Sequence, residues 1–125
     1  MIKFTREDAL RLHHLVARES GGSVGIRDEG LLESALEGAF AGFGGEEFYP
    51  TIQEKAARLG YTLIANHAFV DGNKRIGVLI LLTFLKVNGV ELICTNEDVI
   101  TVGLSVADGT MGYPELLAWV QAHTL

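Results

Sequence analysis

The residues best suited to chemistry lie between positions 67 and 75, which read His-Ala-Phe-Val-Asp-Gly-Asn-Lys-Arg. This signature segment contains an imidazole, a carboxylate, an amide and two cations, and a strongly apolar stretch follows it. An imidazole can accept a proton near neutral pH, and a carboxylate can hold Mg²⁺. We therefore expect a site for phosphoryl or nucleotidyl transfer.

The second half of the segment favours anion binding. A helix is expected to begin at Gly72 or Asn73, where free backbone N–H groups and the helix dipole attract phosphate. Gly72 has no side chain to keep a ligand from the backbone. Lys74 and Arg75 fall in the first turn, where positive charge opposes the dipole, so a bound anion would explain them.

The other polar residues of the segment have more than one interpretation. Asp71 is either a helix N-cap or a Mg²⁺ ligand, and Asn73 either donates to a phosphate oxygen or acts as a neutral ligand. His67 is either a general base for an attacking hydroxyl or a helix-end histidine. A residue of any one of these types in such a position more often has a structural role than a functional one. Their occurrence together before an apolar helix favours a phosphate site.

Composition limits the remaining possibilities. The 125 residues fit one domain, 1–125, and 48% of them are hydrophobic. The net charge of −6 argues against a nucleic-acid-binding surface. Cys94 is the single cysteine, which excludes an intrachain disulfide and agrees with a reducing cytoplasm. The apolar stretch 76–85 is too short to cross a membrane, which takes about 20 residues.

Hydrophobic periodicity predicts a compact all-α fold of about six helices with little strand. The expected helix starts are Thr5, Asp28, Thr51 (with Glu54 in a capping box), Asn73, Asn96 and Pro114. The helix that follows the signature segment is apolar nearly all round and should lie buried at the centre of the bundle.

Residues 41–50 form the most irregular segment, since they combine several glycines with Phe43, Phe48 and Tyr49. Loops of this composition often cover a functional site. The alternative is a connector whose aromatic side chains pack into the core.

The signature segment resembles the motif of the Fic/Doc superfamily, His-Pro-Phe-x-(Asp/Glu)-Gly-Asn-Gly-Arg-x-x-Arg. The chain departs from it at Ala68, Lys74 and Val78, which replace the proline, the second glycine and the last arginine. The lysine is typical of the death-on-curing (Doc) branch. Chain length, the stretch 26–36 and the apolar helix after the motif resemble that branch as well.

This resemblance implies a Fic/Doc-type helical bundle and the toxin of a type II toxin–antitoxin system. Doc-type toxins transfer the γ-phosphate of ATP to a hydroxyl of elongation factor Tu and arrest translation. The resemblance makes His67 the general base and Asp71 the Mg²⁺ ligand. The phosphates would be held by Gly72, Asn73, Lys74 and Arg75.

The resemblance also places a target-docking flap at 41–50, with Phe48 and Tyr49 as its contacts. The chain lacks the inhibitory motif (Ser/Thr)-x-x-x-Glu-(Gly/Asn) of self-restrained Fic proteins, so a Phd-type antitoxin is the expected partner. Two other functions stay open: AMP transfer, as in most Fic enzymes, and a catalytically idle module that only binds an antitoxin.

Overall fold

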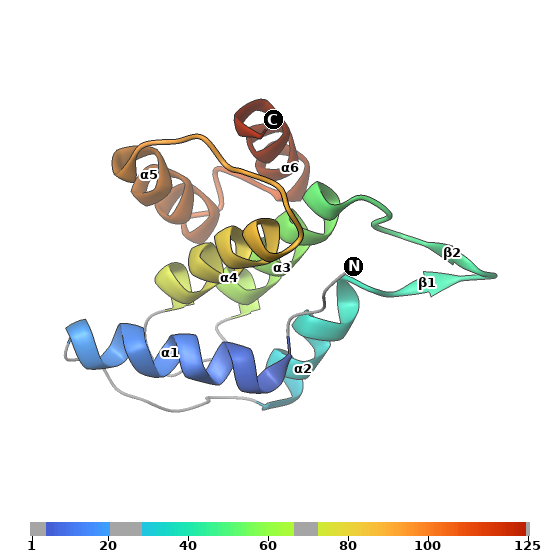
Figure 1. Cartoon of the computed structure of the whole chain (residues 1–125), viewed down its shortest axis with the longest axis horizontal. Coiled ribbons are helices and arrows are strands. Elements are labelled where there is room, and N and C mark those ends of the chain that lie inside the picture. The colour runs from blue at the N-terminus through green and yellow to red at the C-terminus, as the bar shows by residue number, and fades with distance from the viewer. Residues whose placement is uncertain (1–4, 21–28, 67–72, 125) are drawn as a thin grey trace.

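The computed structural model describes residues 5–20, 29–66 and 73–124. Within these ranges it contains six α-helices and one two-stranded hairpin (Figure 1), which confirms the predicted all-α class. The elements are α1 (Arg6–Ser20), α2 (Glu29–Gly38), β1 (Gly42–Phe43), β2 (Glu46–Glu47), α3 (Ile52–Asn66), α4 (Asn73–Val87), α5 (Asn96–Ala107) and α6 (Tyr113–His123). None of the described helices is both long and apolar enough to span a bilayer.

Reciprocal capping boxes begin three of the helices. The Asp8 backbone N–H donates to Thr5 Oγ1 at 3.2 Å, and the Thr5 N–H donates to Asp8 Oδ2 at 3.1 Å. Thr51 and Glu54 make the same pair of bonds before α3, as predicted. Each box satisfies backbone donors that the first helical turn leaves without partners.

The predicted start of α5 was wrong by one residue. Thr95, not Asn96, is the N-cap: its Oγ1 accepts from the Asp98 N–H at 3.1 Å, and Asp98 Oδ2 accepts from the Thr95 N–H at 3.0 Å. A cap at Asn96 would place Val99 three residues later, where no side-chain acceptor could complete the box.

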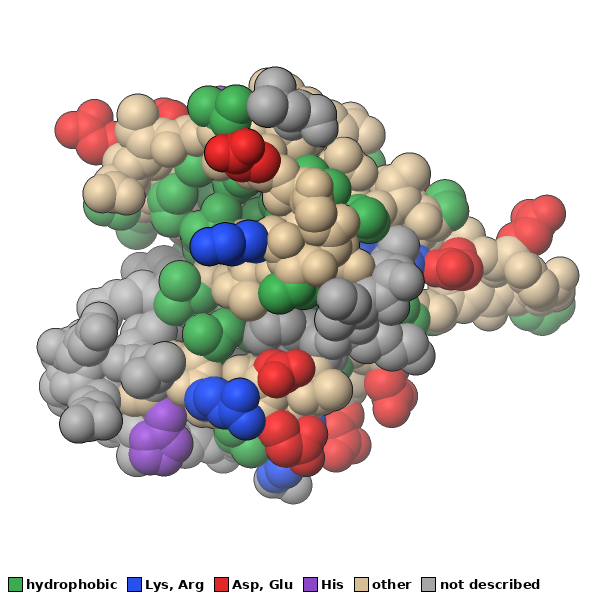
Figure 2. Space-filling model, in the orientation of Figure 1, with side chains coloured by type: hydrophobic (Ala, Val, Ile, Leu, Met, Phe, Trp, Pro, Cys, Tyr) green, Lys and Arg blue, Asp and Glu red, His purple; other side chains and the backbone are tan. Residues whose placement is uncertain are grey.

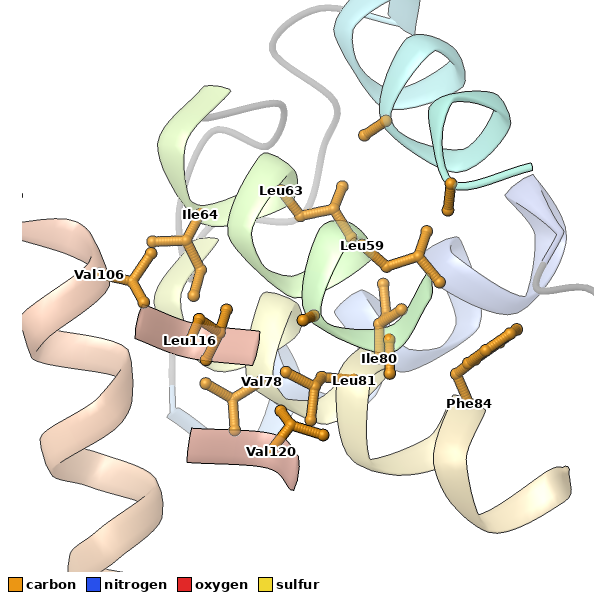
Figure 3. Packing of buried hydrophobic residues seen from close by; sticks show 14 of the residues in the cluster. Leu59, Leu63, Ile64, Val78, Ile80, Leu81, Phe84, Val106, Leu116 and Val120 are labelled. Atoms are coloured by element: carbon orange, nitrogen blue, oxygen red, sulfur yellow. The ribbon is translucent and has the colours of Figure 1, made fainter. Parts of the chain in front are cut away.

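The core lies between α3 and α4 (Figure 3). Leu59 and Leu63 of α3 are buried together with Ile80, Leu81 and Phe84 of α4. Helices α2, α5 and α6 also contact α3, while α1 and α5 contact α4. The predicted central helix, α4, therefore shares the centre of the bundle with α3.

Two glycines allow α3 and α4 to cross closely. A Cβ atom on Gly77 would lie 2.5 Å from Ile64 Cγ1 and 3.1 Å from the Gly60 carbonyl oxygen. A Cβ atom on Gly60 would lie 2.9 Å from Leu81 Cδ1. Real Cβ atoms almost never approach other atoms as closely as 2.5 or 2.9 Å, so the separation of the two helices depends on both glycines.

The segment expected to be irregular contains a β-hairpin that projects from the helices (Figure 1). Gly42 pairs with Glu47 and Phe43 with Glu46, in antiparallel register. Gly44 and Gly45 form the turn with φ of 62° and 85°, the positive values that a two-residue hairpin turn needs. Glycines that prevent a helix here thus allow a tight turn.

Candidate functional site

The signature segment joins two described helix ends. Helix α3 ends at Asn66 and α4 begins at Asn73. The intervening residues 67–72 include His67, Asp71 and Gly72, which lie outside the described residues. Their roles as base, metal ligand and phosphate contact therefore stay predictions.

Helix α4 begins at Asn73, which is one of the two predicted starts. Asn73, Lys74 and Arg75 are its first three residues, and the first turn contains no acidic residue. Their backbone N–H groups point out of the helix start and lack intrahelical acceptors. Their side chains lie outside the described part of the chain. The described backbone thus supplies the electropositive helix end that phosphate prefers.

The close contact of α3 and α4 at Gly60 and Gly77 holds the end of α3 near the start of α4. Gly77 is the fifth residue of α4, and the side chain that it faces, Ile64, lies in the last turn of α3. The crossing therefore sits within about a turn of both ends of the signature segment. Close packing there sets the distance between the end of α3 and the start of α4.

Position 78 belongs to the core rather than to a ligand site. Val78 is 6% exposed, and its side chain lies near Leu116 and Val120 of α6 (Figure 3). The Fic motif has its last arginine at this position, whereas this chain has a packed apolar residue. The described structure thus provides no cation at position 78 to hold a second phosphate.

A cavity of about 280 Å³ lies beside the second half of α3. Tyr61 and Ala65 of α3 line it together with residues 106 and 107 at the end of α5 and residues 108, 109, 111 and 112 of the α5–α6 connection. The carboxylate of Asp108 on its rim accepts hydrogen bonds from the Thr110 hydroxyl and backbone N–H, which lower the pKa of Asp108. The cavity adjoins the end of α3 that leads to His67.

The two predicted flap residues differ in their surroundings. Phe48 is 59% exposed, and Phe43 on β1 is 83% exposed. Tyr49 is half-buried, and its ring meets the Tyr113 ring edge-on at 5.4 Å, with the Arg58 guanidinium 5.4 Å from its centroid. Phe48 is therefore free to contact a partner, while Tyr49 anchors the segment to α3 and α6.

The hairpin and the described end of α3 before the signature segment lie a whole helix apart. The hairpin comes just before the start of α3, and Asn66 ends this helix (Figure 1). A helix of 15 residues at about 1.5 Å per residue is about 22 Å long. A target that touched both places would have to extend along α3.

Sequence reasoning missed Lys55, which lies at the base of the hairpin. Its side chain is buried on α3 and donates to Glu47 Oε2, to the Tyr49 carbonyl and to the Ala39 carbonyl. The available signal was its position: Lys55 comes four residues before Leu59, on the apolar stripe of α3. A charge on a buried stripe requires partners.

Metal binding receives no support from the described side chains. Within residues 5–20, 29–66 and 73–124, no group of three His, Cys, Asp or Glu side chains could hold a metal ion. The predicted Mg²⁺ ligand, Asp71, lies outside these ranges.

Comparison with known proteins finds a family and a relative. A model of the Fic/DOC family matches residues 3–85. The protein named Toxin Doc from Mycolicibacterium smegmatis is 42% identical over 87 residues, which make up 70% of this chain and 65% of that protein. The match thus covers less than two thirds of the length of that relative.

Proposed function

This chain belongs to the Fic/DOC family, and we propose that it is the toxin of a type II toxin–antitoxin pair that transfers the γ-phosphate of ATP to a hydroxyl of elongation factor Tu. The similarity to a protein named Toxin Doc supports the toxin part of this proposal. The observation that carries the chemical part is the start of α4 at Asn73, with Lys74 and Arg75 in an acid-free first turn.

In the proposed reaction, the backbone N–H groups of the first turn of α4 and the cations Lys74 and Arg75 hold the phosphates of ATP. His67 accepts the proton of the target hydroxyl as its oxygen attacks the γ-phosphorus. The bond to the β,γ-bridging oxygen breaks, and ADP leaves. Mg²⁺ held by Asp71 would neutralise phosphate charge.

Two residues favour γ-phosphate over AMP transfer. Lys74 stands where the Fic motif has a glycine, so this chain has a side chain at a position where a glycine would let a phosphate approach the backbone. Val78 is buried in the core and replaces the arginine that would grip a further phosphate. A nucleotide bound without those two contacts is expected to present a different phosphate to the acceptor.

The position of the label in ATP decides between the two transfers. The chain is incubated with elongation factor Tu, Mg²⁺ and ATP labelled at either the α- or the γ-phosphate. We expect label in the target only from the γ position, and none with the His67→Ala variant. Label from the α position alone would instead identify an AMP transferase.

An idle antitoxin-binding module is the second candidate function, and growth arrest tests it. Expression of the chain without its antitoxin should stop growth, and His67→Ala should abolish the arrest, because general-base catalysis contributes about 10²–10⁴-fold in rate. Arrest that persists undiminished in His67→Ala would refute catalysis at this site. Co-expression of a Phd-type antitoxin, whose disordered tail folds as a helix on the toxin, should restore growth.

We propose further that the hairpin docks the target. An extended segment that pairs with it and continues to the signature segment would need about seven residues at roughly 3.3 Å each to span the length of α3. Exchanging Phe48 and Tyr49 for Ser should lower target modification and leave ATP affinity unchanged. Because Tyr49 packs on Tyr113, Phe48→Ser alone is the cleaner variant.

A matched control for Phe48→Ser is Ile100→Ser. Ile100 is also exposed but belongs to α5. Target modification should fall for Phe48→Ser and stay unchanged for Ile100→Ser. Unchanged modification in both variants would refute docking through the hairpin.

A further inference from the structure

The Lys55 ammonium group is buried and fully bonded. Its side chain is 1% exposed, and its three N–H donors have three acceptors: the carbonyl oxygens of Ala39 and Tyr49 and the carboxylate of Glu47. The Phe40 ring lies 5.2 Å from Nζ and adds a cation–π contact. Glu47 supplies the negative charge in this set.

These acceptors lie on both sides of the hairpin. Ala39 follows α2 directly and comes before β1, Glu47 is on β2, and Tyr49 follows β2. One side chain of α3 therefore ties together the segments that enter and leave the hairpin. The Phe48 N–H, which donates to the Ala41 carbonyl at 3.0 Å, closes the hairpin just beyond this point.

Besides Lys55, the described side chains that hold the hairpin at its base are Tyr113 and Arg58, which pack on Tyr49. Each residue from Gly42 to Phe48 is exposed, so no apolar side chain of either strand packs into the core. A two-stranded ribbon without a packed face is marginally stable in water. Figure 2 shows the hairpin extending from the body of the molecule with acidic side chains at its surface. Its angle to α3 must be set at its base, where Lys55 bonds both of its ends and Tyr49 packs on Tyr113.

We propose that Lys55 and Glu47 form a positioning pair, which sets the angle of the hairpin and thereby the affinity for the protein target. This inference rests on the proposed function of the hairpin in target docking. Lys55 acts through the hairpin and touches neither nucleotide nor target. Loss of the Glu47 charge leaves the ammonium group with neutral acceptors only, which weakens the tie without removing any core side chain.

The test compares Glu47→Gln with Glu46→Gln. Both remove one carboxylate from β2, but only Glu47 bonds Lys55, and both residues are exposed, so neither variant should unfold the protein. Hydrogen exchange of backbone amides over 41–49 should accelerate in Glu47→Gln and stay unchanged in Glu46→Gln. Exchange in α3 should be the same in both variants.

Kinetics with elongation factor Tu provide the second readout. Glu47→Gln should raise KM for the target about tenfold. Without the Glu47 charge the hairpin should spend only a small fraction of its time at the angle that binds the target. The kcat and the affinity for ATP should not change. Lys55→Met, which keeps the apolar stem, should have the same effect, with its thermal midpoint measured to establish that it folds.

The outcomes separate this inference from the proposed function. An unchanged KM in Glu47→Gln, with or without faster exchange, would overturn the positioning role while the unaltered chain still modifies its target. A fall in kcat instead of a rise in KM would overturn it too, since that would place the effect at the transferring site. Absence of any transfer by the unaltered chain would contradict the proposed function itself.

Discussion

Cations stand in two places where their surroundings oppose a positive charge, and the two places differ in how the charge is balanced. Lys55 is buried, but a carboxylate and two carbonyls surround it. Lys74 and Arg75 stand at the positive end of the α4 dipole, and the first turn of α4 has no acidic residue. The first charge is satisfied within the protein, whereas the second arrangement is the one that an external anion would stabilise.

Tyr113 provides a prediction that depends on pH. Burial, together with the nearby Glu54 and Tyr49, raises the pKa of Tyr113 from 10.0 to about 12. Its hydroxyl donates to the Glu54 carbonyl oxygen at 3.3 Å, which requires the neutral phenol. The folded state therefore holds this proton more tightly than the unfolded state. Its contribution to stability is complete below pH 10 and is lost as pH rises through 12.

The comparison with Tyr113→Phe isolates this effect. The free energy of unfolding of the unaltered chain should fall more steeply between pH 10 and 12 than that of Tyr113→Phe. A titration of phenolate absorbance should also lose its highest-pH step in the variant. Equal slopes for the two proteins would contradict a raised pKa at this residue.

At the residue scale, the sequence was informative where a local pattern decides the structure. The helix start at Thr5 and the capping box at Thr51 could be predicted because a cap depends on residues within one helical turn of each other. The same rule applied to Thr95 would have corrected the start of α5. Lys55 could be recognised as unusual, but its acceptors at Ala39 and Glu47 are distant in sequence and could not be identified.

Helix capping gives an element-scale prediction for α5. Thr95→Ala should lower the free energy of unfolding by about 1 kcal/mol, because Thr95 Oγ1 satisfies the Asp98 N–H. Asn96→Ala should be neutral or slightly stabilising, since Asn96 is the first helical residue and alanine is the better helix former. Urea unfolding with both variants checks this assignment; a larger loss for Asn96→Ala would contradict it.

The crossing of α3 and α4 gives a second prediction. Gly77→Ala should lower the free energy of unfolding by about 1–2 kcal/mol, because overpacking against Ile64 and the Gly60 carbonyl outweighs the gain in helix propensity. Gly60→Ala should cost less, since the atom that it meets at 2.9 Å is the flexible tip of Leu81.

Gly38→Ala is the matched control for the crossing. Gly38 ends α2, and a Cβ atom there would meet nothing within 4 Å. This variant should be neutral or stabilised by up to about 1 kcal/mol. Urea midpoints for the three variants should therefore rank Gly77→Ala lowest and Gly38→Ala highest. Equal midpoints for Gly77→Ala and Gly38→Ala would show that the helices are not in close contact.

Among the elements, the hairpin was the least predictable. The glycines at 44 and 45 excluded a helix, but strands of two residues each have no periodicity to read. The sequence also could not show which aromatic side chains of the hairpin segment are buried. Tyr49 is half-buried because Tyr113 of α6, which is distant in sequence, packs against it. The alternative that the aromatic side chains of segment 41–50 pack into the core is right for Tyr49, which packs on Tyr113, and wrong for Phe48, which is exposed; a role of the segment in covering a site stays a prediction.

On the scale of the whole molecule, periodicity and the motif predicted more than composition did. Apolar spacing indicated an all-α bundle, and the apolar length of α4 indicated a central position. The equally central place of α3 was not apparent, because its apolar stripe is interrupted by Lys55 and polar residues such as Gln53, Glu54 and Arg58 occupy its less buried side. The motif pointed to the Fic/Doc family and its Doc branch, and the comparisons confirm that resemblance.

The proposed activity depends on the closeness of two helix ends. Close packing at Gly60 and Gly77 brings the end of α3, which leads to His67, to the start of α4, which carries Lys74 and Arg75. The proposed phosphoryl transfer requires that the proton acceptor predicted at His67 and the phosphate site predicted at the start of α4 lie close together.

Intact-mass spectrometry of elongation factor Tu tests this claim most directly. The purified chain, or its His67→Ala variant, is incubated with the target, Mg²⁺ and ATP. The account predicts that the target gains the mass of one phosphate with the unaltered chain and no mass with the variant. An unmodified target, or one that gains the same mass with His67→Ala, would contradict it.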